Sequence, residues 1–343
     1  MKPRFVLALV GFTLLHHLCS AQDAGAQVVP TEDVQKRADS LMDKARHLSD
    51  IRSPNAPSFR LKATFSFNGR DLQRVEGTYT EIWVSNSQWR RETVVNNWRR
   101  VEIGGATRFW LLDNTDGFPE PGALLPSILS MFPTTSANLA FESVSDHAEM
   151  DPPAECAITE PDARHLKLGF CFDKKSGVLL QRILPEVRPT NIVANSCQYG
   201  SFRKIGDHWF PREIACFEDR HRKLDAEVVD LSPEPSPDAA LFTPPPGAIE
   251  LGNCSVKAEP PRAVNTPNPG LPFGSPDQNS KVTVSLVVDT KGKTQNVRVV
   301  DSGGVHSDKA AISAVSSWRF KPATCNGDPM PMMINVQVDF RYR

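Results

Sequence analysis

The sequence predicts an α+β protein whose 343 residues form two folded parts. Three observations lead to this prediction. The length exceeds what one hydrophobic core usually organises, since single cores rarely grow beyond about 250 residues. One amphipathic helix is followed by many strand-like segments, and a shorter group of strands with one helix ends the chain. Proline-rich segments lie between the two groups and indicate a boundary there.

The N-terminus has the pattern of a secretory signal peptide at residues 1–21. Lys2 and Arg4 form a basic start, Phe5–Leu15 is apolar, and Cys19–Ala21 offers small residues for cleavage. Two alternatives remain, a retained membrane anchor and a lipid attached at Cys19, although the apolar stretch is shorter than the ~20 residues of a spanning helix. The sequence therefore predicts a periplasmic protein, either free or associated with the membrane.

The remaining cysteines predict disulfide bonds. An even number of cysteines in an exported chain indicates disulfides, with isolated buried thiols as the alternative. Fifteen pairings are available to six cysteines, and chain order and spacing favour Cys156–Cys171, Cys197–Cys216 and Cys254–Cys325. The sequence has no CxxC motif, so we expect neither zinc binding nor thioredoxin-type redox chemistry.

The N-terminal part begins with an amphipathic helix, Thr31–Asp50, whose apolar residues recur at helical spacing. Thr31 is placed to cap it, and Glu32 and Asp33 suit the positive end of its dipole. An apolar segment, Pro121–Pro133, predicts a second helix packed on a sheet. The expected strands are 59–69, 74–85, 88–105, 107–115, 164–172, 177–184, 191–204, 208–218 and 222–231.

The segment Trp89–Arg100 combines tryptophan and arginine, which raises the question of nucleic-acid binding. Asn96–Asn97 fits a two-residue hairpin turn, and the arginines then lie on the solvent side of a hairpin. The facing pairs would be Val95 with Trp98 and Arg91 with Glu102. Positive and negative charges also nearly cancel, with 39 basic and 40 acidic residues. We therefore expect no nucleic-acid partner.

This order of elements over residues 31–232 resembles the periplasmic lipoprotein-carrier and lipoprotein-receptor family with the LolA/LolB-like fold. The resemblance implies an antiparallel half-barrel closed by helices around an apolar cavity that holds acyl chains. The alternative is an antiparallel sheet with an ordinary filled core. Residues 233–252 then form a proline-rich linker, and residues 259–278, also rich in proline, lie along the C-terminal domain.

The C-terminal part reads as a small sheet of β-β-α-β order with a helix on one face. Val282, Val284, Leu286 and Val288 alternate inward on the first strand, and Thr290–Lys293 forms the turn to the second. Ser307 is expected to cap a helix with Ala311, Ile312, Val315 and Trp318 on one side. In the last strand, Ile334, Val336, Val338, Phe340 and Tyr342 share one face, and Asn335, Gln337, Asp339 and Arg341 the other.

The run VSLVVDTKGKTQNVRVVDSGG, the helix, WRFKPA and the INVQVDFRY strand closely resemble the C-terminal domain of TonB-family energy transducers, over residues 253–343. The resemblance implies binding to an outer-membrane receptor, whose extended Ton box adds a strand to the edge of the sheet. The implied edge comprises Ile334, Asn335, Val336, Gln337, Val338, Asp339 and Phe340. The family motif is Trp318, Arg319, Phe320, Lys321 and Pro322, with Trp318 and Phe320 in the core and Arg319 and Lys321 in solvent.

Two departures from that family stand in the sequence. The usual Tyr-Pro before the first strand is Leu271–Pro272 here, and the only apolar N-terminal stretch is lost if the signal peptide is cleaved. No catalytic motif and no metal-ligand spacing of histidines occurs, so we expect neither an enzyme nor a cofactor. The sequence thus predicts a binder of an outer-membrane receptor or another envelope protein, with a role in TonB-linked transport. The alternatives are a lipid or lipoprotein carrier and a homodimer formed through the last strand.

Overall fold

The computed structural model describes residues 31–53, 56–68, 74–105, 107–113, 125–126, 128–132, 139–162, 166–187, 192–218, 220–254, 258–270 and 280–340. The predicted signal peptide, Leu271–Pro272, Arg341 and Tyr342 lie outside these residues. In the part of the chain that is described, no helix is both long and apolar enough to cross a membrane. The chain divides into two compact units, and residues 52–126 group with residues 226–343.

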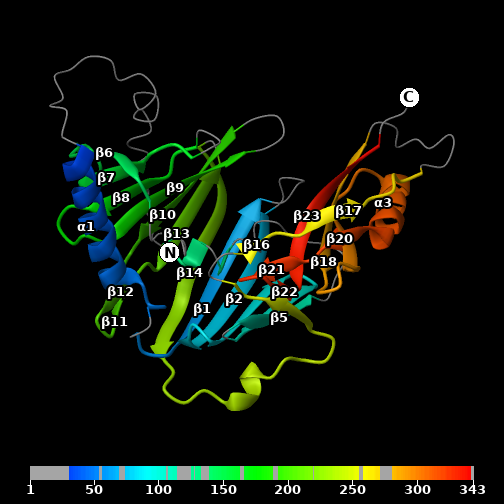
Figure 1. Ribbon diagram of the computed structural model, residues 1–343. Coiled ribbons are helices and arrows are strands. Elements are labelled where there is room, and N and C mark those ends of the chain that lie inside the picture. The colour runs from blue at the N-terminus through cyan, green and yellow to red at the C-terminus, as the bar shows by residue number, and fades with distance from the viewer. Residues whose placement is uncertain are drawn as a thin grey trace. The chain divides into compact units, whose positions relative to one another are not determined.

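The first unit contains residues 1–51 and 127–225. Its helix α1 (Thr31–Ser49) has Glu32 and Asp33 in the first turn, as predicted. Val34, Ala38, Met42 and Ala45 are buried at helical spacing. This apolar face packs α1 against β6 (Phe141–His147) and β12 (His208–Phe210), and Figure 1 shows α1 beside β6.

The sheet of the first unit is antiparallel, in the order β13-β10-β9-β8-β7-β6. Besides β6, its strands are β7 (Ala154–Thr159), β8 (Gly169–Asp173), β9 (Leu179–Val187), β10 (Ile192–Gly200) and β13 (Glu213–Glu218). A separate hairpin pairs β11 (Arg203–Ile205) with β12. The sequence did not predict β6 and β7, because Ser143, Asp146 and His147 interrupt the apolar alternation of β6.

The predicted apolar helix at 121–133 is only partly within the described residues. Leu125–Pro126 and Ile128–Leu129 are helical. In the first unit Leu129, Met131 and Phe132 are buried. Arg182 donates a hydrogen bond to the Met131 carbonyl at 3.0 Å, and the Tyr199 hydroxyl donates one to the Ile128 carbonyl. These buried donors satisfy carbonyls that the short helical segment leaves open.

The second unit contains the antiparallel strand order β15-β5-β4-β3-β2-β1-β14. In β1 (Phe59–Asn68), Phe59, Leu61, Ala63, Phe65 and Phe67 are buried in alternation, as period-two patterning predicts. The other strands are β2 (Arg74–Ser85), β3 (Gln88–Val95), β4 (Trp98–Gly104), β5 (Arg108–Asp113), β14 (His221–Pro233) and β15 (Ile249–Gly252).

The hairpin of β3 and β4 is the predicted one. Asn96 has a positive φ of 50°, and Val95 lies opposite Trp98, while Arg91 lies opposite Glu102. The prediction for the Arg91 side chain was wrong, however. Its guanidinium is mostly buried and pairs with Glu81 of β2, so Arg91 does not extend into solvent. The buried carboxylate on the neighbouring strand attracts Arg91 more strongly than water does.

The segment predicted as a linker, 233–252, contains ordered elements. A short 3-10 helix, η2 (Ala239–Phe242), is capped by Asp238, whose side chain accepts a hydrogen bond from the Ala240 amide. The segment ends in β15, which pairs antiparallel with β5. Leu251 of β15 and Leu111 of β5 are buried together with Val287. The division of the chain into the domains 31–232 and 253–343 stays a prediction.

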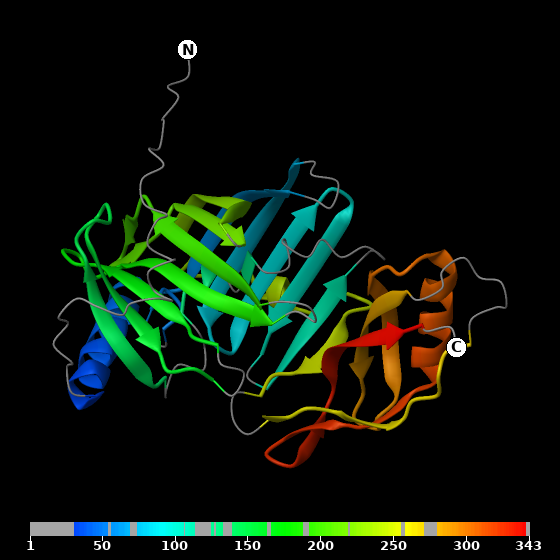
Figure 2. The same ribbon diagram turned by 90° about the horizontal axis from the view of Figure 1, so that it is seen from above.

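The C-terminal sheet of the second unit has the order β19-β18-β23, with α3 (Val305–Ser317) against β18 and β19. Its strands are β18 (Lys281–Val288), β19 (Thr294–Asp301) and β23 (Met332–Asp339). Figure 2 shows α3, in orange, beside these strands. Five short strands complete the unit: β16 (Ala258–Glu259), β17 (Arg262–Asn265), β20 (Arg319–Lys321), β21 (Ala323–Cys325) and β22 (Asp328–Met330).

Two predictions for α3 were wrong. The helix begins at Val305 after Gly304, so Ser307 is not its cap. Ser307 is buried instead, and its hydroxyl is 2.5 Å from that of Ser280. Ile312 is 37 % exposed and does not join Ala311 and Val315 in the core. Because α3 has few apolar residues, the sheet that it covers decides which side of the helix is buried. The apolar pattern of the helix alone predicts this side poorly.

Candidate functional site

The candidate site is the edge of the C-terminal sheet formed by β23. Val282, Val284, Leu286 and Val288 of β18 are buried in the core of this sheet, as predicted. From β23, Val338 is buried, and Ile334 and Val336 pack against the same core. Asn335, Gln337 and Asp339 are exposed. The alternation therefore places one face of the predicted edge residues on the core and the other in solvent.

Beyond β23, no further strand of the described chain joins this sheet. All residues of β18 pair with β23 in an uninterrupted register, from Lys281 opposite Asp339 to Val288 opposite Met332. A regular antiparallel edge presents a straight row of backbone donors and acceptors. This makes β23 geometrically suited to accept another extended segment.

The other edge of the sheet, β19, has a different geometry. Its register with β18 shifts twice, between Thr283 and Val284 and between Ser285 and Val287. Asn296 of β19 has a positive φ of 50°, and α3 packs on this strand. Bulges twist a strand and disturb its ladder, which protects an edge against further pairing. The two edges of the sheet are therefore not equivalent.

The Trp318–Pro322 motif supports the core of this sheet. Phe320 is 8 % exposed, Trp318 packs against the same core, and Arg319 and Lys321 are exposed, as predicted. The rings of Trp318 and Phe320 lie 6.3 Å apart at a tilt of 49°. Phe320 also donates its amide to the Gly292 carbonyl at 2.9 Å. The motif is thus fixed to the turn between β18 and β19.

That turn is shaped by Asp289. Its Oδ1 accepts hydrogen bonds from the amides of Lys291 and Lys293, and its Oδ2 accepts one from Gln295. Partial burial acts to raise the pKa of Asp289, but the backbone donors of Lys293 and Lys291 outweigh it and lower the pKa. The carboxylate therefore stays charged and holds the turn that carries Gly292.

The structure contains the three predicted disulfides, Cys156–Cys171, Cys197–Cys216 and Cys254–Cys325. The first two join residues that lie directly opposite each other on neighbouring strands. The third connects residues 71 positions apart, from the segment after β15 to β21. The disulfides fix the strand register in the first unit and the start of the C-terminal region in the second.

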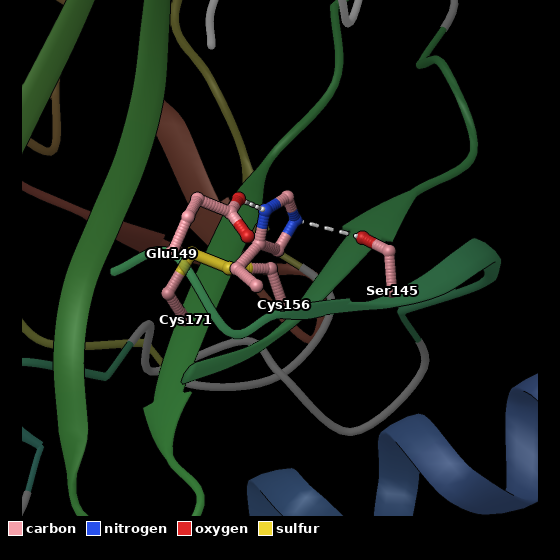
Figure 3. The surroundings of a disulfide bond; sticks show 5 residues. Ser145, Glu149, Cys156 and Cys171 are labelled. Atoms are coloured by element: carbon pink, nitrogen blue, oxygen red, sulfur yellow. Dashed lines mark hydrogen bonds and ion pairs between the residues drawn. A yellow bond between two sulfur atoms is a disulfide. The ribbon is translucent and has the colours of Figure 1, made fainter. Parts of the chain in front are cut away.

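A short chain of polar side chains lies near the Cys156–Cys171 disulfide (Figure 3). The Ser145 hydroxyl is 3.0 Å from Nε2 of His147, and Glu149 Oε1 is 2.8 Å from Nδ1. These residue types also occur in hydrolase triads. Here they alternate along the end of one strand and the following turn, so local spacing alone brings them together. No group of residues suited to hold a metal ion occurs in the described part of the chain.

A groove beside α3 was not predicted from the sequence. It has a volume of about 510 Å³ and lies between α3 and the segment Pro267–Gly270. Trp318 Nε1 donates a hydrogen bond to the Pro267 carbonyl at 3.0 Å, which fixes this proline segment. The signal in the sequence was the row of small residues on α3, Ala310, Ser313, Ala314 and Ser317, whose spacing places them on one helix face.

Comparisons with known proteins agree with these observations. Residues 276–342 match the family model of the Gram-negative bacterial TonB protein C-terminal domain. A search of curated proteins gave no significant match.

Several solved structures resemble parts of the chain. A LolA superfamily protein from Nitrosomonas europaea has a TM-score of 0.40 and 9 % identity, covering 60 % of this chain and 97 % of its own. A proposed outer-membrane lipoprotein-sorting protein domain from Vibrio parahaemolyticus has a TM-score of 0.39 and 12 % identity, covering 62 % of this chain and 97 % of its own. MucB has a TM-score of 0.31 and 14 % identity, covering 82 % of this chain and 97 % of its own.

The family match and the disulfides support a location in the cell envelope. The family match and the regular pairing of β23 with β18 both fall in the C-terminal region of the chain. Residues 276–342 match the TonB C-terminal domain family, and in the described part of this region β23 is an edge strand of the sheet.

Proposed function

We propose that β23 binds an extended segment of an envelope protein by strand addition. The observation that carries the proposal is the uninterrupted pairing of β23 with β18, with no further described strand paired to β23. The match of residues 276–342 to the TonB C-terminal family supports an outer-membrane receptor as the first candidate partner. Strand addition satisfies backbone groups that an edge otherwise leaves to water.

The register identifies which backbone groups of β23 are available. Phe340 donates its amide to the Ser280 carbonyl at 2.9 Å, so Phe340 and Ser280 form a hydrogen-bonded pair. Such pairs recur at every second residue of an antiparallel ladder. Val338 and Val336 therefore bond to β18, whereas the amides and carbonyls of Asn335 and Gln337 point to the open edge. The proposed partner would bond to these outward groups.

This assignment gives a specific test. Gln337→Pro removes one outward N–H and leaves the β18 ladder intact, because proline is tolerated on edge strands. Gln337→Ala changes the same side chain but keeps the N–H, so it is the matched control. We would place a photo-crosslinking amino acid at Asp339 in cells and identify the captured protein by mass spectrometry.

We expect the parent chain and Gln337→Ala to capture the same envelope protein, and Gln337→Pro to lose that adduct. Unchanged thermal melting would show that the proline variant is folded. Capture of an envelope protein at the same level by Gln337→Pro would refute strand addition. Adducts with a second copy of this chain alone would identify the edge as a dimer interface and contradict the proposed partner.

The lipid-carrier alternative stays a prediction. In the first unit, the described apolar residues Leu129, Met131 and Phe132 are buried against the protein itself. Their neighbouring carbonyls are bonded to Arg182 and Tyr199. This arrangement does not favour an acyl-chain ligand over a filled core.

A further inference from the structure

The groove beside α3 has a composition suited to a ligand. Its long wall is the α3 face with Ala310 and Ala314, and its opposite wall contains Pro267 and Pro269. Small residues and prolines leave a space of about 510 Å³, which falls within the usual range of ligand pockets. Apart from His306 and Lys309, the α3 residues that line this groove are alanines and serines, which leave space for an incoming group.

The walls of this groove are held in place before any ligand arrives. The proline segment follows β17, which pairs with β20, and Trp318 donates to the Pro267 carbonyl. On the other side, Ala311 and Val315 anchor α3 in the core. A groove with two fixed walls costs little entropy to organise on binding.

The charge in the groove has one sign. Among the described residues that line it, Lys309 and His306 are the ionisable ones, and neither wall contributes a carboxylate. The nearby carboxylate of Asp308 is occupied, because it accepts hydrogen bonds from the Ser302 hydroxyl and the Gly303 amide. The groove therefore complements a negative group on its ligand.

Apolar side chains continue past Lys309 on the outer surface of α3. Val305 is 66 % exposed and Ile312 is 37 % exposed. They are seven residues apart and so lie on one side of the helix, with Lys309 between them. A small anion would leave these side chains uncovered, whereas a peptide could place a carboxylate at Lys309 and apolar residues against Val305 and Ile312.

We propose that the groove between α3 and Pro267–Gly270 binds a peptide segment of a partner protein through an acidic side chain seated at Lys309. This contact is separate from the β23 edge. The sheet order is β19-β18-β23, and α3 packs on β18 and β19. The proposal does not depend on strand addition, and the two sites could contact different segments of one partner.

The experiment uses the immobilised full chain and two pools of octapeptides. The pools are random except at a central position, which is glutamate in one and glutamine in the other. Retention of each pool is measured by mass spectrometry. Lys309→Glu reverses the charge in the groove, and Ser313→Trp fills it from an exposed helix position. Lys291→Glu makes the same charge change at an exposed turn residue that does not line the groove.

We expect the glutamate pool to be retained about fivefold more than the glutamine pool, which is the scale of one charge-assisted contact. Lys309→Glu should abolish this preference, Ser313→Trp should reduce retention of both pools, and Lys291→Glu should change neither. Gln337→Pro should also leave the preference intact, which separates this site from β23. Equal retention of the pools by the parent chain, or an unchanged preference in Lys309→Glu, would overturn the proposal.

Discussion

Arg91 of β3 donates a hydrogen bond from Nε to Oε1 of Glu81, its direct neighbour on β2, at 3.1 Å. Arg52 also pairs with Glu81, and the Tyr79 hydroxyl donates to Oε2 at 3.0 Å. Glu81 is completely buried. One buried carboxylate therefore bonds to two guanidinium groups and a phenol inside the second unit.

Glu81→Gln should destabilise the fold by about 3–5 kcal/mol, because it removes the buried charge with which two mostly buried arginines pair. Glu76→Gln is the matched control on the same strand, since Glu76 is exposed. Urea unfolding followed by tryptophan fluorescence would measure both. A loss below about 1 kcal/mol for Glu81→Gln would show that water or other groups compensate the arginines.

The same network predicts a dependence of stability on pH. Burial acts to raise the pKa of Glu81, but the charges of Arg52 and Arg91 outweigh it and lower the pKa from 4.5 to about 2. A lowered folded-state pKa stabilises the fold above the ordinary value, and this stability is lost as pH falls toward about 2. The stability difference between the parent chain and Glu81→Gln should therefore shrink from pH 4.5 downward. A difference that is constant from pH 5 to pH 2 would contradict the assignment.

The Cys254–Cys325 and Cys156–Cys171 disulfides should differ in their contribution to stability. The Cys254–Cys325 bond closes the longest loop, 71 residues, against 15 for Cys156–Cys171. In the chain-entropy model, these bonds contribute about 4 and about 3 kcal/mol. Paired serine substitutions, compared by urea unfolding, should follow that order. A larger loss for the Cys156–Cys171 pair would show that fixing β7 to β8 matters more than loop length.

The C-terminal sheet was predictable because its strands carry their own pattern. Val282, Val284, Leu286 and Val288 alternate in the sequence, and they are buried together in the structure. Two of the disulfide pairs were predictable for a related reason, since cysteines that are 15 or 19 residues apart lie opposite each other on antiparallel strands. The edge position of β23 followed from the family resemblance, and the structure adds which of its amides face outward.

The remaining features depend on partners that no local pattern reveals. Strands β15, β17 and β20 have three or four residues each, too few for a period to be read, and they exist because a neighbouring strand bonds to them. Arg91 was assigned to solvent because charged residues are usually exposed, and its buried partner Glu81 lies ten residues away. The groove beside α3 is formed by two segments about 40 residues apart in sequence, so only the fold brings them together.

Gly292 provides the sharpest test of the contact between the β18–β19 turn and the Trp318–Pro322 motif. It has a φ of +76°, and a Cβ added there would lie 1.8 Å from the Phe320 carbonyl oxygen. Gly292→Ala therefore combines backbone strain with a clash against main chain, and we expect a loss of at least about 2 kcal/mol. Gly327→Ala is the matched control, because Gly327 also has a positive φ, +98°, but nothing lies within 4 Å of its added Cβ. It should cost only about 1 kcal/mol, the strain alone. Equal losses in the two variants, measured by urea unfolding, would show that the motif moves away from the turn at little cost and that the core beneath β23 does not depend on this contact.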